Sequence, residues 1–370
     1  MDPPYVRTQA MRRTLIILAC SAPILRAEEP VDFNRDIRPF LNKNCTTCHG
    51  GVKQAGEVSF IFREEALGKG ESGKPVIVPG DPAASEMMRR IKSTDPDEKM
   101  PPPEEHPHGL EPEQVALLER WIKEGAKWGE HWSFQKPVQP AVPSLKDTAW
   151  PKVDLDRLVL AKLEAEKLTP SPEASPAEWF RRVSLDLIGL PPSVDEWNAF
   201  QQASTANPQA AMEATVDRLL ASPQFGERWA AMWLDLARYS DTMGFEKDPH
   251  RDVWPFRDWV IRAFNQGMSF DTFTVKQLAG DLLENPEPGD LIATGFHRNT
   301  QNNTEGGTDD EEYRTAAVMD RVNTTWTAWN ATTFGCIQCH SHPYDPFPHE
   351  DYFKFMAFFD NTEDSDLNTD

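Results

Sequence analysis

Apolar residues recur at helical spacing along most of the chain, and no run of alternating apolar and polar residues predicts a strand. The clearest helix covers 112–126, because Pro112 suits a first helical position and an apolar stripe follows it. That stripe is formed by Val115, Leu118, Trp121 and Ile122. Further helices are predicted over 33–44, 83–92, 258–264, 272–283 and 311–329. Three more apolar stripes predict helices of their own. They are formed by Leu155, Leu158, Val159 and Leu163, by Trp179, Val183 and Leu187, and by Trp229, Met232, Trp233 and Leu236. The predicted fold class is therefore mainly α.

Prolines divide the chain into two helical parts. Pro137, Pro140, Pro143 and Pro151 favour a stiff, extended linker over 130–152. This linker separates a small helical domain over 31–129 from a larger, irregular all-α domain over 153–364. Residues 365–370 form a polar tail.

The N-terminus is typical of an exported protein. Arg12 and Arg13 precede the mostly apolar run 14–25, which predicts a signal peptide over 1–27. That run is too short to span a membrane, and no other stretch approaches about 20 apolar residues, so no transmembrane helix is expected. The predicted location is the periplasm or cell envelope. A lipid anchor through Cys20 is an alternative.

Four of the five cysteines lie in two copies of the pattern Cys-x-x-Cys-His. In haem c, two cysteines at this spacing form thioethers with the porphyrin and the adjacent histidine binds the iron. A redox dithiol, a disulfide or a zinc site can also use a lone Cys-x-x-Cys pair. Here each pair carries the immediate histidine, and nearly the whole chain separates the pairs. We therefore predict two covalent haem c groups, held by Cys45, Cys48 and His49 and by Cys336, Cys339 and His340.

A second axial ligand is expected on each iron. For the first iron we predict Met100, because the prolines that follow it stiffen its loop and a methionine sulfur is a common haem c ligand. Its competitors are Met87 and Met88 in a predicted helix, and His106 and His108, which are expected to be solvated loop residues. For the second iron we prefer His297. An open sixth coordination position on this iron is one alternative. His342 is too close in sequence to His340 to reach the opposite side. The other candidates are His250, His349, Met243, Met319 and Met356.

These residues predict a secreted c-type cytochrome that transfers single electrons. Whether the chain is an enzyme stays open, with electron transfer favoured over stand-alone catalysis. The alternative is a subunit of an extracellular haem-dependent enzyme whose second haem is open and whose substrate is unknown, a glycan being one option.

The formal net charge of −21 limits the partners. Nucleic acid is not expected, because its phosphates need lysine and arginine. A redox partner protein with a basic docking patch is expected instead. Their association should slow as salt is raised, and a salt-independent association rate would contradict this expectation.

The motifs also resemble a known family. The runs DFNRDIRP at 32–39, VPGDP at 78–82, KMPP at 99–102 and WIKEGA at 121–126, together with the first Cys-x-x-Cys-His and Gly50, resemble the planctomycete-type cytochrome c domain over 31–129. The runs RRVSLDLIGLPP at 181–192, LDLARY at 234–239 and QLAGDL at 277–282, and the second Cys-x-x-Cys-His with its Asp-Pro at 345–346, resemble the uncharacterised cytochrome-like domain that adjoins it.

The resemblance implies covalent haem and secretion, and no established reaction. It implies a small cytochrome c-like domain followed by the larger helical one. Members of this family usually continue into a further domain, so the chain resembles a truncated or split member, with a further domain or protein as an additional expected partner.

Overall fold

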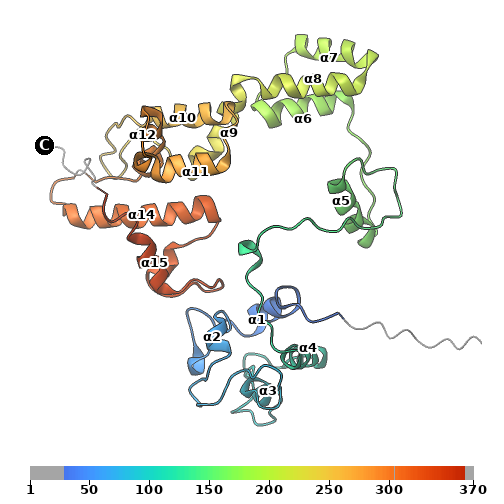
Figure 1. Cartoon of the computed structure of the whole chain (residues 1–370), viewed down its shortest axis with the longest axis vertical. Coiled ribbons are helices and arrows are strands. Elements are labelled where there is room, and N and C mark those ends of the chain that lie inside the picture. The colour runs from blue at the N-terminus through green and yellow to red at the C-terminus, as the bar shows by residue number, and fades with distance from the viewer. Residues whose placement is uncertain (1–28, 304, 363–370) are drawn as a thin grey trace, which may run out of the picture.

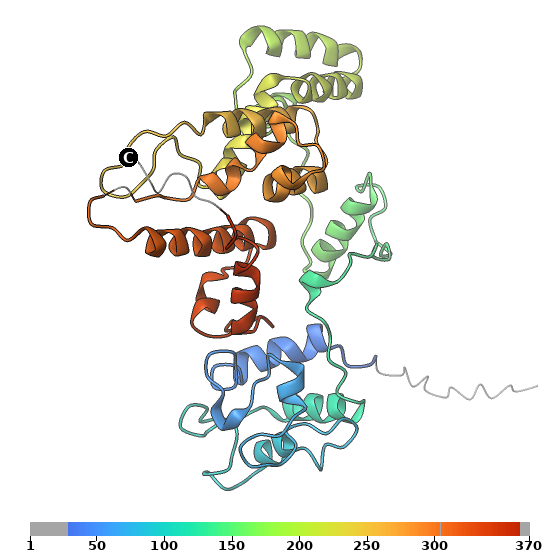
Figure 2. The same cartoon turned by 60° about the vertical axis from the view of Figure 1, so that its left-hand side comes forward.

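The computed structural model describes residues 29–303 and 305–362. The predicted signal peptide with Cys20, and the polar tail over 365–370, therefore lie outside the described residues. Within the described part the chain forms helices joined by loops, with isolated bridges and no strands (Figures 1 and 2). The prediction of a mainly α fold is confirmed. None of the described helices combines the length and the hydropathy that crossing a bilayer requires.

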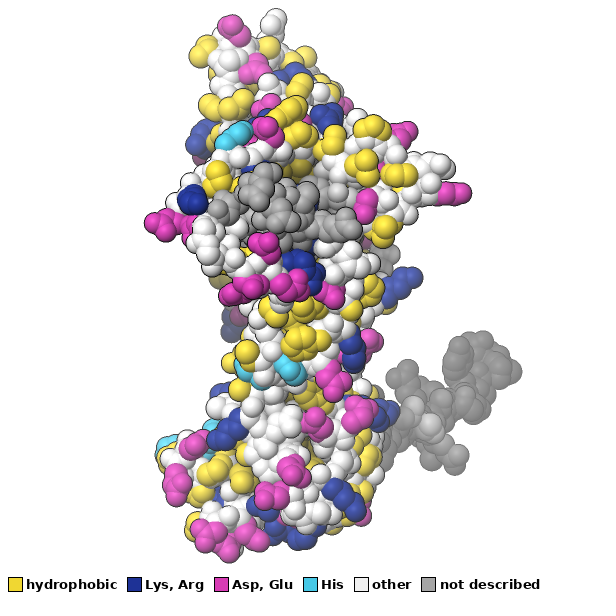
Figure 3. Space-filling model, turned by 90° about the vertical axis from the view of Figure 1, so that its left-hand side faces the viewer, with side chains coloured by type: hydrophobic (Ala, Val, Ile, Leu, Met, Phe, Trp, Pro, Cys, Tyr) yellow, Lys and Arg dark blue, Asp and Glu magenta, His cyan; other side chains and the backbone are white. Residues whose placement is uncertain are grey.

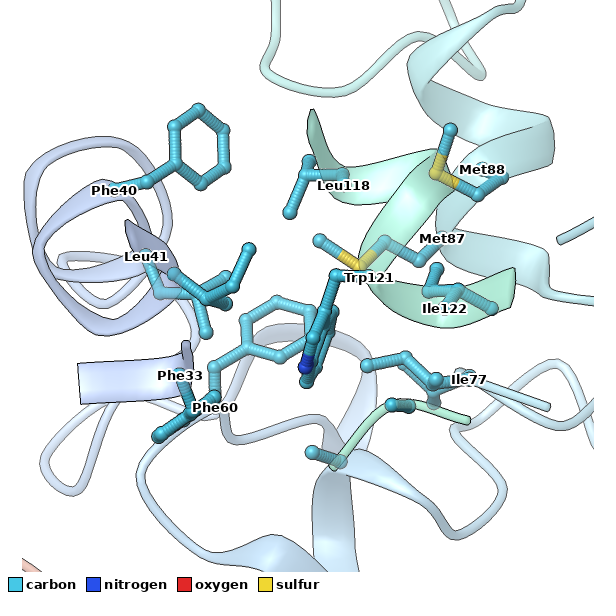
Figure 4. Packing of buried hydrophobic residues seen from close by; sticks show 14 of the residues in the cluster. Phe33, Phe40, Leu41, Phe60, Ile77, Met87, Met88, Leu118, Trp121 and Ile122 are labelled. Atoms are coloured by element: carbon cyan, nitrogen blue, oxygen red, sulfur yellow. The ribbon is translucent and has the colours of Figure 1, made fainter. Parts of the chain in front are cut away.

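The N-terminal helices surround one apolar core. A π-helical turn at Phe33–Ile37 leads into α1 (Arg38–Asn44), and α2 (Arg63–Ala66), α3 (Glu86–Ile91) and α4 (Pro112–Lys123) follow. Leu118, Trp121 and Ile122 of α4 are almost completely buried against Phe33 and Leu41 (Figure 4). This confirms the apolar stripe predicted for α4.

Residues at the helix starts explain several boundaries. Helix α4 has Pro112 at its first position and a capping box between Glu111 and Gln114, whose side-chain oxygen accepts a hydrogen bond from Glu111 N–H at 3.0 Å. Reciprocal boxes between a serine and a glutamate three residues later begin α6 (Pro176–Ile188) and α7 (Val194–Ala206). These boxes satisfy backbone N–H groups that the first helical turn leaves unpaired.

The larger part contains three smaller cores. Helices α6, α7 and α8 (Pro208–Leu220) enclose Phe180 and Phe200. The second core is formed by α9 (Pro223–Leu236), α10 (Trp254–Asn265), α11 (Phe270–Ala279), α12 (Pro288–Ala293) and α13 (Gly295–Arg298). The third lies between α14 (Asp310–Asn330), the 3-10 helix Gly335–Gln338 and α15 (His349–Met356).

The apolar face predicted for 155–163 is wrong. Helix α5 (Asp154–Ala165) forms, but Leu155 is 68% and Val159 48% exposed, whereas Leu160 is only 2% exposed. The end of the linker also folds back on this helix, since the backbone N–H groups of Lys146 and Asp147 both donate to Glu164. The stripe on α9 is also only partly buried, since Trp233 is covered while Met232 and Leu236 are exposed.

One buried carboxylate ties α3 to its surroundings. Glu86 is 8% exposed and lies 2.7 Å from Arg89, 3.0 Å from Arg90 and 3.8 Å from Lys74. Its hydrogen bond with Arg89 is the largest cause that lowers the pKa of Glu86 to about 2. The carboxylate is therefore the stable form in the folded chain at neutral pH.

This pairing predicts an acid-sensitive contribution to stability. The pKa of Glu86 in the folded state lies below the unfolded value of about 4.3, so its stabilisation is present above that value and is lost as pH falls toward 2. Glu86→Gln should lower the free energy of unfolding at pH 7 by about 1–3 kcal/mol and flatten the pH dependence between the two values. Urea unfolding across this pH range measures both. Glu64→Gln is the control, because Glu64 is 83% exposed beside Arg63. Parallel curves for Glu86→Gln and wild type would contradict the assignment.

Candidate functional site

The first Cys-x-x-Cys-His motif forms one more helical turn at the end of α1. The backbone N–H of Cys45 donates to Leu41 O at 2.8 Å, and that of His49 donates to Cys45 O at 2.9 Å. Residues three and four positions apart on a helical turn share a face. The turn therefore places both sulfur atoms and the imidazole of this motif on one side of the chain.

A glycine ends this turn. A Cβ at Gly50 would lie 2.3 Å from Thr46 O, which leaves no room for a side chain. The chain then reverses: Gly50 N–H donates to Lys53 O at 2.8 Å and Phe60 N–H donates to His49 O at 2.9 Å. These bonds hold His49 at the start of a tight loop.

A cavity of about 490 Å³ opens beside this face. It falls within the range of about 300–1,000 Å³ that is usual for cofactor sites. Cys45, Cys48, His49 and Met100 all line it, although Met100 lies far along the chain. The backbone N–H of Met100 donates to Arg90 O at 3.1 Å and so ties its loop to the end of α3. The structure thus gathers the four residues that the sequence singled out here.

Two competitors for the iron also reach the cavity. Met87 of α3 lines it, and so does His106, which was expected to be a solvated loop residue. His106 lies six residues after Met100 on the same proline-rich loop, so a loop that folds over the cavity carries both. Met88 is instead 2% exposed in the apolar core.

The chemistry of the cavity wall fits haem c. Burial raises the pKa of Cys45 to about 12 and is the largest cause lowering the pKa of His49, so a neutral thiol and a neutral imidazole are favoured. A neutral imidazole is the form that binds a metal. Nδ1 of His49 is buried without a hydrogen-bond partner, and the wall includes apolar Val58, Phe60 and Ile91. Cys45 and Cys48 would hold the porphyrin, and His49 the iron.

Charged residues at this site were missed by sequence reasoning. Lys53 Nζ and Glu105 Oε2 each lie 3.9 Å from Cys48 Sγ, and Glu86 and Arg90 also line the cavity. No local motif marks these positions, because loop closure brings them to the cavity.

The second motif lies on the core between α14 and α15. Cys336 packs partly buried against that core, and burial raises the pKa of its thiol. Cys339 is exposed, and Nδ1 of His340 lies 2.8 Å from Ser341 O. The two sulfur atoms therefore lie in different surroundings, one against apolar side chains and one facing solvent.

Several candidate ligands lie near this second motif. Nδ1 of His349 is 2.6 Å from Ile337 O, inside the motif itself, and Met319 and Met356 pack against the core that holds Cys336. His250 is exposed and pairs with Asp252 at 3.1 Å.

His297 has different surroundings. Its ring contacts Phe296 and Phe359 with centroid distances of 5.1 and 4.8 Å, and burial lowers the pKa of His297 to about 3. Both of its ring nitrogens are buried without a hydrogen-bond partner in the described structure. As an iron ligand His297 stays a prediction.

A second cavity of about 610 Å³ lies between the end of α9 and α14. Arg238, which pairs with Asp320, and Asn299 both line it. The side-chain oxygen of Asn299 is buried without a partner, and the aromatic pair Phe245 and Tyr313 forms another part of the wall. Its lining offers hydrogen-bond donors, acceptors and ring surface to a polar ligand.

Two family models match the chain. The model described as Planctomycete cytochrome C (PSCyt1) matches residues 45–104, which contain the first motif and Met100. The model PSCyt2, described as a protein of unknown function (DUF1549), matches residues 154–364, more than half of the chain. Comparison with curated proteins and with solved structures gives no match. The resemblance inferred from the sequence motifs is confirmed.

Proposed function

Since the chain belongs to the PSCyt2 family and carries a planctomycete cytochrome c domain, we propose that it is an exported c-type cytochrome with two haem c groups that transfers single electrons. The observation that carries this proposal is the first cavity, where two cysteines, a neutral histidine and a methionine meet. Haem c supplies a one-electron couple between ferrous and ferric iron.

The residues of the first site have separate roles. Cys45 and Cys48 would anchor the group, and His49 and Met100 would bind its iron. The apolar wall around Val58, Phe60 and Ile91 keeps water from the buried side of the cavity. A buried, thioether-ligated site favours a higher reduction potential than an exposed one.

The second site rests on Cys336, Cys339 and His340. Covalent haem attachment takes place outside the cytoplasm, in agreement with the predicted signal peptide. The location that we propose is therefore the periplasm or cell envelope.

Haem counting tests this function. Protein matured with haem-attachment machinery should contain two haems per chain in a pyridine haemochromogen assay. Replacing Cys336 and Cys339 with alanine should leave one, and so should the matched pair Cys45→Ala and Cys48→Ala. Zinc without haem absorption would contradict a cytochrome, and one haem in the wild type would contradict the second site.

The axial role of Met100 has its own test. Met100→Ala should abolish the sulfur-to-iron charge-transfer band of the ferric protein and lower the reduction potential, because a thioether ligand raises it. The control is Met87→Leu, since Met87 lines the same cavity from α3. Loss of the band in Met87→Leu with retention in Met100→Ala would transfer the role to Met87.

A further inference from the structure

The loops that follow the two Cys-x-x-Cys-His motifs touch each other. A Cβ placed on Gly51 would lie 2.0 Å from His342 O and 3.2 Å from Ser341 O. One placed on Gly50 would lie 3.4 Å from Pro343 O. Nearly the whole chain separates these loops in sequence, yet in both views α15 lies next to the N-terminal part of the chain that contains α1 and α2 (Figures 1 and 2).

Gly51 is needed here for space. Its φ is outside the left-handed region, so its backbone conformation does not demand glycine. Its ideal Cβ would instead meet a backbone carbonyl that cannot rotate away. The contact requires that Gly51 carry no side chain.

Side chains of the second loop reinforce this contact by meeting His131, Phe134 and Arg38, which lie outside the first loop. Asp345 lies 3.5 Å from Nε2 of His131, and it attracts Arg38 of α1. Phe134 meets Phe347 edge to face at a centroid distance of 5.6 Å. Phe347 in turn packs on the core that carries Cys336. Figure 3 shows histidine side chains at the narrow middle of the molecule, where its upper and lower parts are in contact.

The contact limits the distance between the two histidines of the motifs. Gly51 lies two residues after His49, and His342 lies two residues after His340. Two residues of extended chain span at most about 7 Å, so the Cα atoms of His49 and His340 are no more than about 20 Å apart. Groups anchored at these positions are therefore neighbours.

We propose that the contact between Gly51 and the carbonyl of His342 joins the two haem sites into one coupled pair. This inference rests on the proposed function, because it needs a group at each motif. Gly51 acts as a positioning residue: it is not part of the lining of the first cavity, and it sets the separation of the two anchors. Without this contact the sites would be two independent carriers on a proline-rich linker.

The test compares three full-length, haem-loaded proteins: wild type, Gly51→Ala and Gly289→Ala. Gly289 is the matched control, because a Cβ there meets nothing within 4 Å. Haem content, circular dichroism of the reduced Soret band and small-angle X-ray scattering are measured on each. Wild type and Gly289→Ala should show two haems, a bisignate Soret band from the coupled pair and a compact profile. Gly51→Ala should keep two haems but lose the bisignate band and show a larger radius of gyration.

Asp345→Asn provides a second variant should Gly51→Ala fail to fold. It removes the charge that faces His131 and Arg38 without adding volume, so it should weaken the same band and expand the molecule. Two haems with a single-signed Soret band in the wild type would overturn the coupled pair. An unchanged bisignate band in both Gly51→Ala and Asp345→Asn would overturn the role of the contact. One haem per chain in the wild type would instead overturn the proposed function, and the pair with it.

Discussion

The hydrogen bond from His49 N–H to Cys45 O is the constraint on which the rest of the structure depends. It adds one helical turn to α1 and puts two cysteine side chains and one histidine side chain on one face. Leu41, whose carbonyl accepts the bond from Cys45 N–H, is buried in the same core as Trp121, so this turn is attached to the N-terminal core. A domain too small to wrap a porphyrin thus needs a rigid helix end, two anchors and one loop that returns across the cavity.

The same turn connects the first site to the distant end of the chain. Gly50 must be small because the turn is tight, and Gly51 must be small because another loop lies on it. One short segment therefore carries two steric demands, one local and one long-range. The acidic side chain at 345 adds an electrostatic hold where His131 and Arg38 approach it. Site geometry and domain docking are consequently set by neighbouring residues.

The spacing of apolar residues predicted individual helices better than it predicted which segments those helices pack against. Helix α4 was predictable, because Pro112 and the spacing of Leu118, Trp121 and Ile122 agree. Helices α7 and α8 were not predicted individually, since isolated apolar residues such as Phe200 lie among alanine and polar residues. In α5, periodicity identified the apolar positions but not the face that is buried: Leu160 is 2% exposed, whereas Leu155 is 68% exposed. Which face of a helix is buried depends on the segment that packs against it, and that segment can lie far away in the sequence.

The residues of the candidate site also differ in how far local sequence predicts them. Cys45, Cys48 and His49 are predictable, because their spacing is itself the geometry of one helical turn. The opposite side of the cavity depends on a loop closure, which brings Met100 and also His106 to one wall. The contact between the loops that follow the two motifs could not be predicted from local sequence, because the two loops are far apart along the chain. In the sequence, this contact is marked by Gly51. The backbone conformation at residue 51 does not require glycine, and the nearby carbonyl of His342 explains why a side chain does not fit there.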